Sequence, residues 1–251
     1  HEIYSIDPDP EIKQKDFSGI YLDNWENYMD ALDRAGEICF DGGEPFYTKQ
    51  CTTILETLID RGMTNKLIQT TTNGSATDYQ YSLLNQFKNV AFDVSIDGIN
   101  NLYSLVRSPH DWTWWTENHN RMLKHQNIVR KYQSVIHCLN VHQLPEMLEY
   151  FTSVNDSPKR RFELHTIVTR PYLGTHIVPN QILEVVGNKL ADMMPLFRGE
   201  EIDNVGNAIK HIEYSMNNKN KTDEENFKKF VDIFGPVKKL DYQSYLPWSI
   251  K

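Results

Sequence analysis

The sequence predicts an α/β fold, a barrel or partial barrel of parallel strands followed by a helical extension. Five strand-like segments alternate with helical patterns, at 37–41, 67–72, 90–97, 134–141 and 162–168. They are about 25 to 40 residues apart, a spacing that suits right-handed βαβ crossovers and therefore parallel pairing. No pattern indicates a reversal of strand order, so we favour a barrel. A doubly wound open sheet is the alternative.

Helical patterns occupy the gaps between the strand-like segments. Apolar residues at helical spacing follow Thr48 and end at Gly62, a residue type typical of helix C-termini. Thr77 is a typical N-cap for a second helix. We expect a third helix over 112–131 and a fourth from about 144 to 154.

The pattern becomes entirely helical beyond Arg170-Pro171. An amphipathic helix is predicted over 179–197. A capping box at 222–225 starts another helix, which we expect to stop at Gly235-Pro236. The chain is therefore expected to consist of a barrel unit, residues 1–178, and a helical C-terminal extension, residues 179–251.

Composition narrows the classes of partner and location. The 251 residues include 26 Lys and Arg against 34 Asp and Glu, a net charge of −8 that argues against a nonspecific nucleic-acid surface. No apolar run reaches the roughly 20 residues that a membrane span needs, and no signal peptide is recognised. Cys39, Cys51 and Cys138 are far apart, so we expect packing residues in a reducing, cytoplasmic setting.

Polar residues collect where the strand-like segments end. Two adjacent glycines follow the first segment, where they permit positive φ and let a ligand approach without meeting a Cβ. Because the carboxyl ends of parallel strands lie on one face, we predict a small-molecule site there. The candidate residues at these ends are Gly42, Gly43, Glu44, Pro45, Thr72, Asn73, Ser95, Asp97 and Asn140.

The segment 90–97 has one apolar and one polar face. Its polar face carries Asp93, Ser95 and Asp97, and two unpaired carboxylates in a dry core would be costly. A polar lumen or mouth filled by a ligand explains this pattern better. In 134–141 a similar alternation predicts Ser134 on the polar face and Val135 on the apolar face. The alternative reading is that pairs such as Asn73-Gly74 and Asp97-Gly98 only form turns.

Taken in order, these residues resemble the radical S-adenosylmethionine (SAM) enzymes, and most closely the SPASM/twitch-type branch. The likeness spans roughly residues 25 to 170 and is carried by Gly42-Gly43-Glu44-Pro45, Thr72-Asn73-Gly74, Val94-Ser95-Ile96-Asp97-Gly98 and Arg107. It implies a partial (β/α)6 TIM-like barrel. It also implies an oxidoreductase that uses a [4Fe–4S] cluster to cleave SAM to a 5′-deoxyadenosyl radical. That radical would abstract hydrogen from a substrate, and a peptide is the branch-level expectation.

The resemblance also implies roles at the methionyl end of SAM. Gly42, Gly43 and Glu44 would hold the amino group, mainly through backbone atoms. Arg107 would pair with the methionyl carboxylate, although a solvated helix residue is its alternative interpretation. Thr72-Asn73 would line the same pocket.

For the adenosyl end, the resemblance assigns the ribose hydroxyls to Ser95 and Asp97. Asn140 would approach the adenosyl group, and backbone at 168–171 would border the adenine.

The sequence departs from this family at the cluster. The family's CxxxCxxC loop is missing, and no first barrel strand precedes Ile38. Since the chain opens at His1, we expect the cluster loop upstream and a catalytically silent chain without it. No cysteine follows Cys138, so no auxiliary cluster is expected. Two alternatives stay open: a cluster-free barrel that binds SAM or another nucleoside, and an unrelated βα-barrel lyase or isomerase with Asp93 or Asp97 as its base.

Overall fold

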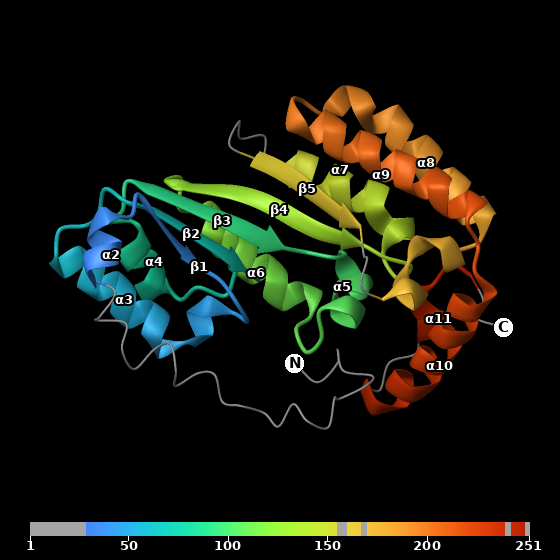
Figure 1. The fold of residues 1–251 in the computed structure, drawn as a ribbon, viewed down its shortest axis with the longest axis horizontal. Coiled ribbons are helices and arrows are strands. Elements are labelled where there is room, and N and C mark those ends of the chain that lie inside the picture. The colour runs from blue at the N-terminus through green and yellow to red at the C-terminus, as the bar shows by residue number, and fades with distance from the viewer. Residues whose placement is uncertain (1–28, 155–159, 167–169, 239–241, 249–251) are drawn as a thin grey trace.

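The computed structural model describes residues 29–154, 160–166, 170–238 and 242–248, which contain one parallel sheet (Figure 1). Its strands follow chain order without the reversal that a doubly wound sheet requires. The α/β class is therefore confirmed, whereas β1 and β5 lie at opposite edges and the sheet does not close into a barrel. The strands are β1 (Glu37–Phe40), β2 (Leu67–Thr72), β3 (Asn89–Ser95), β4 (Ile128–Ile136) and β5 (Arg160–Thr166).

One face of the sheet is buried under helices. Tyr81 packs against Phe92 of β3, and Phe151 stacks on Tyr132 of β4 and meets Phe162 of β5 edge-on. These rings place the helices that follow β2 and β4 on the same face. The helices up to β5 are α2 (Met29–Arg34), α3 (Lys49–Asp60), α4 (Asp78–Leu84), α5 (Asn100–Val106), α6 (Trp112–Leu123) and α7 (Leu144–Val154).

Local sequence signals set several of these helix ends. Thr48 caps α3, since its hydroxyl accepts from the Cys51 N–H, and Gly62 follows the helix at φ +71°. Thr77 and Gln80 form a capping box at the start of α4. The predicted caps of the first two crossover helices are confirmed.

The predicted boundary between the third helix and the fourth strand is wrong. Residues 128–131 belong to β4 and not to a helix, because α6 ends at Leu123. The Arg130 guanidinium reaches back from the strand and donates to the carbonyl oxygens of Met122, at 3.4 Å, and His125, at 3.3 Å. A cation on the last carbonyls of a helix is a favourable C-terminal cap.

The predicted faces are also wrong where 134–141 overlaps β4, at residues 134–136. Ser134 is 3% exposed and faces the helices, whereas Val135 is 36% exposed on the opposite face. The other face of the sheet is thus open and mixed in character, unlike the two buried faces of most parallel sheets.

The C-terminal part is helical, as predicted, and packs beside β5 (Figure 1). Asn204 donates to the Phe162 carbonyl oxygen at 3.0 Å, so α9 covers the outer edge of β5. The predicted stop at Gly235-Pro236 is wrong, because α10 continues to Lys238. Pro236 lacks one backbone N–H donor, and only two helical residues follow it. These helices are α8 (Asn180–Met193), α9 (Glu200–Asn217), α10 (Lys221–Lys238) and α11 (Tyr242–Tyr245).

Short 3-10 turns complete the description: η3 (Pro45–Tyr47), η4 (Val141–Gln143), η5 (Pro171–Leu173), η6 (Thr175–Ile177) and η7 (Met194–Leu196). The expected unit boundary at residue 178 falls between η6 and α8. The division of the chain into two units at this boundary stays a prediction.

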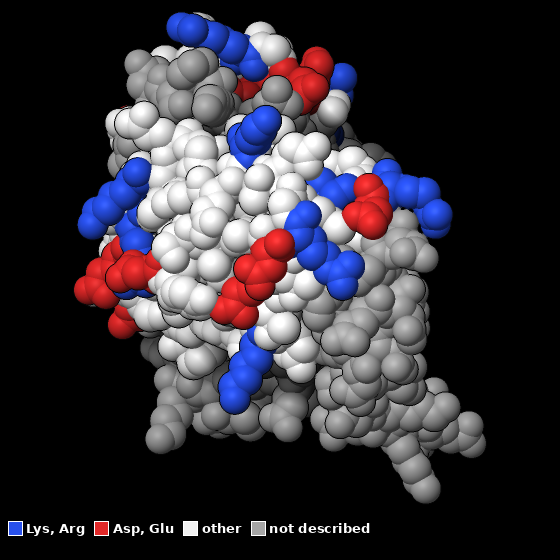
Figure 2. All heavy atoms as spheres, turned by 90° about the vertical axis from the view of Figure 1, so that its left-hand side faces the viewer, with Lys and Arg blue, Asp and Glu red and all other residues white. Residues whose placement is uncertain are grey.

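Charged side chains are mixed in sign on the face at the left of Figure 1, where α2, α3 and α4 lie. Figure 2 shows basic and acidic groups interspersed over a largely uncharged surface there. Such a surface lacks the single-sign stripe typical of nonspecific nucleic-acid binding. None of the helices in the described ranges is long and apolar enough to cross a membrane.

Candidate functional site

The loop after β1 is a tight, open turn. Gly42 and Gly43 have φ of +91° and +55°, values that side-chain-bearing residues rarely adopt. A Cβ built on either glycine would meet no other atom within 4 Å. Pro45 then begins η3 and is buried. The two glycines therefore leave main-chain atoms accessible from solvent, as a ligand-binding turn requires.

Glu44 fastens this loop to the end of β2. Its carboxylate accepts from the Thr72 hydroxyl at 2.7 Å and from the Asn73 N–H at 2.6 Å. Burial raises the pKa of Glu44, and the hydrogen bonds from Asn73 and Thr72 oppose that rise. The structure thus joins three of the predicted residues, Glu44, Thr72 and Asn73, with the Glu44 side chain turned toward the protein.

A second cluster joins the ends of β3 and β4. The Asp97 carboxylate pairs with the Arg107 guanidinium at 2.7 Å and accepts from the Val135 N–H at 2.8 Å and the Ser134 hydroxyl at 3.4 Å. Arg107 is the C-cap of α5. Asp97 and Arg107, predicted to serve opposite ends of one ligand, are thus direct partners in this structure.

The remaining predicted residues divide between the two faces. Thr72 pairs in register with Val94, so it faces the helices, whereas Ser95 faces the open side. Asn140 is 2% exposed, and its amide is used by backbone: it donates to the Val135 carbonyl oxygen and accepts from the His137 N–H. Asn140 therefore holds the turn after β4. The backbone predicted to border adenine lies partly outside the described residues, at 167–169.

Sequence reasoning missed a polar network on the open face. Lys131 bridges Asp93, at 3.3 Å, and Glu163, at 2.8 Å, across three neighbouring strands. Gln69 and Gln133 donate to these same carboxylates. Although burial alone would lower it, the pKa of Lys131 is raised by Glu163 and Asp93, and Lys131 in turn lowers the pKa of Glu163. Buried and more exposed residues alternate along 128–136. This period of two, typical of a strand, was the sequence signal that could have placed Lys131 on the open face.

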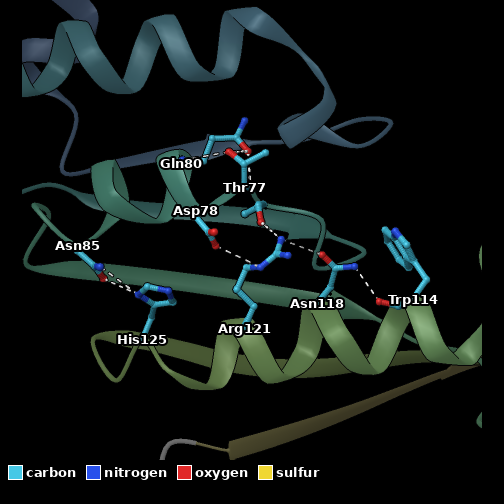
Figure 3. A network of polar contacts seen from close by, with 9 residues as sticks. Thr77, Asp78, Gln80, Asn85, Trp114, Asn118, Arg121 and His125 are labelled. Carbon is cyan, nitrogen blue, oxygen red and sulfur yellow. Dashed lines mark hydrogen bonds and ion pairs between the residues drawn. The ribbon is translucent and has the colours of Figure 1, made fainter.

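Polar contacts tie helices α4 and α6 together (Figure 3). The Arg121 guanidinium contacts the Asp78 carboxylate at 3.2 Å, the Asn118 side-chain oxygen at 3.4 Å and the Ala76 carbonyl oxygen at 3.4 Å. Asn118 in turn donates to the Trp114 carbonyl oxygen at 2.7 Å. This network fixes the segment that follows Asn73, so we assign it a supporting role.

The cysteines do not assemble a metal site. Cys51 and Cys138 are buried packing residues, as predicted, whereas Cys39 is exposed, so that prediction was wrong for Cys39. Within the described ranges, no group of three or more His, Cys, Asp or Glu side chains is placed to hold a metal ion.

No protein-family model matches this chain, and no curated protein matches it either. The functional argument therefore depends on the geometry above.

Proposed function

We propose that the carboxyl edge of the sheet binds SAM, and that the chain is the SAM-binding part of a radical SAM oxidoreductase with a partial (β/α)6 TIM-like barrel. One observation carries this proposal. The ends of four neighbouring parallel strands are linked at a single edge into two polar clusters, Glu44 with Thr72-Asn73 and Asp97 with Arg107. Ligands of open α/β sheets bind at that edge.

The residues at this edge fit the parts of SAM. The main-chain carbonyl oxygens of the Gly42-Gly43 turn are acceptors for the methionyl ammonium group. A guanidinium forms charge-assisted hydrogen bonds with carboxylates, so Arg107, which pairs with Asp97 at this edge, is the group that we assign to the methionyl carboxylate. A carboxylate accepts about four hydrogen bonds, and Asp97 uses three, which leaves one for a ribose hydroxyl beside Ser95.

The residues of this chain do not fit a [4Fe–4S] cluster. Cluster ligands are accessible thiolates, whereas Cys51 and Cys138 are buried and burial raises the pKa of the Cys51 thiol to about 12. We therefore derive no step through a cluster. This chain would bind and orient SAM, and a peptide is the proposed substrate by resemblance alone.

The open-face network supports a second candidate function, that of a lyase or isomerase. Asp93 is a buried carboxylate on a face that the described helices leave open, and its partner Lys131 lies 3.3 Å away. A carboxylate on such a face is a candidate general base for a bound substrate.

Calorimetric titration with SAM and with adenosine tests the first proposal. We expect SAM to bind, and the Ser95→Ala, Asp97→Asn double variant to lose at least about tenfold in affinity, because a hydrogen bond to a charged group contributes about 1.5–3 kcal/mol. Asp60→Asn, at an exposed position on α3, is the matched control and should bind as the parent does.

Other outcomes separate the alternatives. Equal affinity for adenosine and SAM would favour a general nucleoside site. No binding of SAM, or binding that the double variant leaves unchanged, would refute the proposal. If Asp93→Asn weakens ligand binding and the Ser95→Ala, Asp97→Asn variant does not, the acid–base alternative is favoured.

A further inference from the structure

A cavity of about 490 Å³ lies in the C-terminal helical part. It is bounded by η6, the first turn of α8, the N-terminal half of α10 and Trp248. Its lining residues are Ile177, Val178, Pro179, Asn180, Gln181, Lys219, Glu224, Phe227, Lys228 and Trp248. None of the residues assigned to SAM lines it, so its function needs a separate explanation.

The inner wall of this cavity is apolar. Val178 is 0% and Phe227 is 3% exposed, and Ile177 is also buried. The Trp248 indole forms a further wall and is held by an edge-on contact with the His142 ring, with centroids 5.8 Å apart. Pockets of this volume with aromatic and aliphatic walls are typical of sites for small organic molecules.

The rim of the cavity is positively charged. Two lysines, Lys219 and Lys228, face one carboxylate, Glu224, which leaves a formal charge of +1. The Lys219 ammonium donates to the Val178 carbonyl oxygen, at the cavity wall. An ammonium group has three donors, so this contact leaves donors for a ligand. Burial lowers the pKa of Lys219, while Glu224 opposes that shift.

Backbone donors add to this rim. Asn180 and Gln181 are the first two residues of α8, and Pro179 provides no side-chain cap. The N–H groups of a first helical turn have no partner within the helix, and they carry the positive end of its dipole. The lysines and these donors together favour one anionic group beside an apolar wall.

From this combination we propose that the cavity binds a small organic carboxylate with an aromatic or aliphatic body. The carboxylate lies between Lys219, Lys228 and the start of α8, and the body packs against Val178, Phe227 and Trp248. A bare inorganic anion would leave the apolar wall unused, and a polyphosphate would meet too few cations. The site is independent of the proposed SAM function.

The test uses the full chain with 4-phenylbutyrate as the probe and the neutral 4-phenylbutyramide as its matched analogue. Binding is measured by ligand-observed NMR relaxation. We expect a dissociation constant on the order of 1 mM for the carboxylate, as suits a probe of this size, and at least about fivefold weaker binding of the amide.

Variants locate the site. Lys228→Met should weaken binding of the carboxylate about three- to tenfold and leave the amide unchanged. Lys229→Met, the exposed neighbour on α10 that does not line the cavity, is the matched control and should behave as the parent does. Gln181→Trp should block both probes without lowering the urea midpoint of unfolding.

Three results would overturn the proposal: equal affinity for the two probes, equal effects of the Lys228 and Lys229 substitutions, or no binding at 20 mM probe, which is about twenty times the expected dissociation constant. The Ser95→Ala, Asp97→Asn variant should bind 4-phenylbutyrate as the parent does. A failure of the SAM proposal is thereby distinguishable from a failure of this one.

Discussion

The ion pair between Asp97 and Arg107 should stabilise the sheet edge measurably in the absence of any ligand. The two groups are 2.7 Å apart, and their side chains are only 14% and 30% exposed. Exposed ion pairs contribute about 0.2–1 kcal/mol, whereas breaking a buried pair costs about 3–5 kcal/mol. For this half-buried pair we expect a coupling free energy of about 1–2 kcal/mol.

A double-mutant cycle of Asp97→Asn and Arg107→Met measures that coupling. Asparagine keeps an oxygen for the Val135 N–H, so the substitution chiefly removes the charge. Arg107 also interacts with other groups, and the cycle cancels those contributions. The free energy of unfolding is obtained from urea titration of the four proteins at pH 7, provided that the slope with urea is unchanged.

The matched cycle uses the exposed pair Lys189 and Glu146, whose charged atoms are 2.8 Å apart and whose side chains are 53% and 44% exposed. That pair should couple by no more than about 0.5 kcal/mol and lose its coupling in 1 M salt, where the Debye length is about 3 Å. A coupling below about 0.3 kcal/mol between Asp97 and Arg107, or one as salt-sensitive as the control, would show that burial does not strengthen this pair.

Burial lowers the pKa of His119 to about 4, below its ordinary value of 6.5, so the unfolded state binds more protons between these pH values and stability falls as pH falls through them. His119→Gln should therefore remove about 3 kcal/mol of the pH dependence of the free energy of unfolding, measured by urea titration over pH 4 to 6.5. Gly43→Ala should lower the free energy of unfolding by about 1 kcal/mol, because φ is +55° there. Gly206→Ala, inside α9 with open space at its Cβ, should raise it by about 0.5–1 kcal/mol, and effects of the same sign would contradict the backbone argument.

Local signals in the sequence predicted much of the fold. The β2 strand has the predicted bounds, Thr77 caps α4, and Gly62 follows the end of α3, as their residue types indicate. The alternation in 90–97 correctly separated a buried apolar face from a polar one, because side chains alternate along any strand. In each case the relevant physics acts within a few neighbouring residues.

The wrong helix and strand boundaries lie where contacts between residues far apart in the sequence determine the local structure. Arg130 and Lys131 suggest a solvated helix by residue type, but Arg130 caps the end of α6 and Lys131 pairs with carboxylates on two other strands. Both residues acquire partners only once the strand register is set. At Pro236 residue type indicated a stop, whereas α10 continues to Lys238.

The candidate site shows the same limit. The positions of Glu44, Asn73 and Asp97 at strand ends followed from parallel pairing, but their hydrogen-bond partners did not. Asn140 illustrates the difference, because a buried amide that satisfies two backbone groups holds a turn whatever else binds nearby. Residue type alone does not distinguish a binding group from such a turn former.

The contacts at the sheet edge divide the predicted residues by what they can offer a ligand. The Glu44 carboxylate accepts hydrogen bonds from Thr72 and Asn73. Its main effect is therefore to hold the glycine turn in place, and not to offer a negative charge to a ligand. Asp97 and Arg107 neutralise each other, and the Asp97 carboxylate, with three contacts, can accept one further hydrogen bond. A zwitterionic ligand suits such a pair, since it adds one positive and one negative group without leaving a charge unmatched. SAM, the proposed ligand, combines such a zwitterionic methionyl group with a sulfonium cation and so has a net charge of +1, which distinguishes it from an anionic nucleotide at this edge.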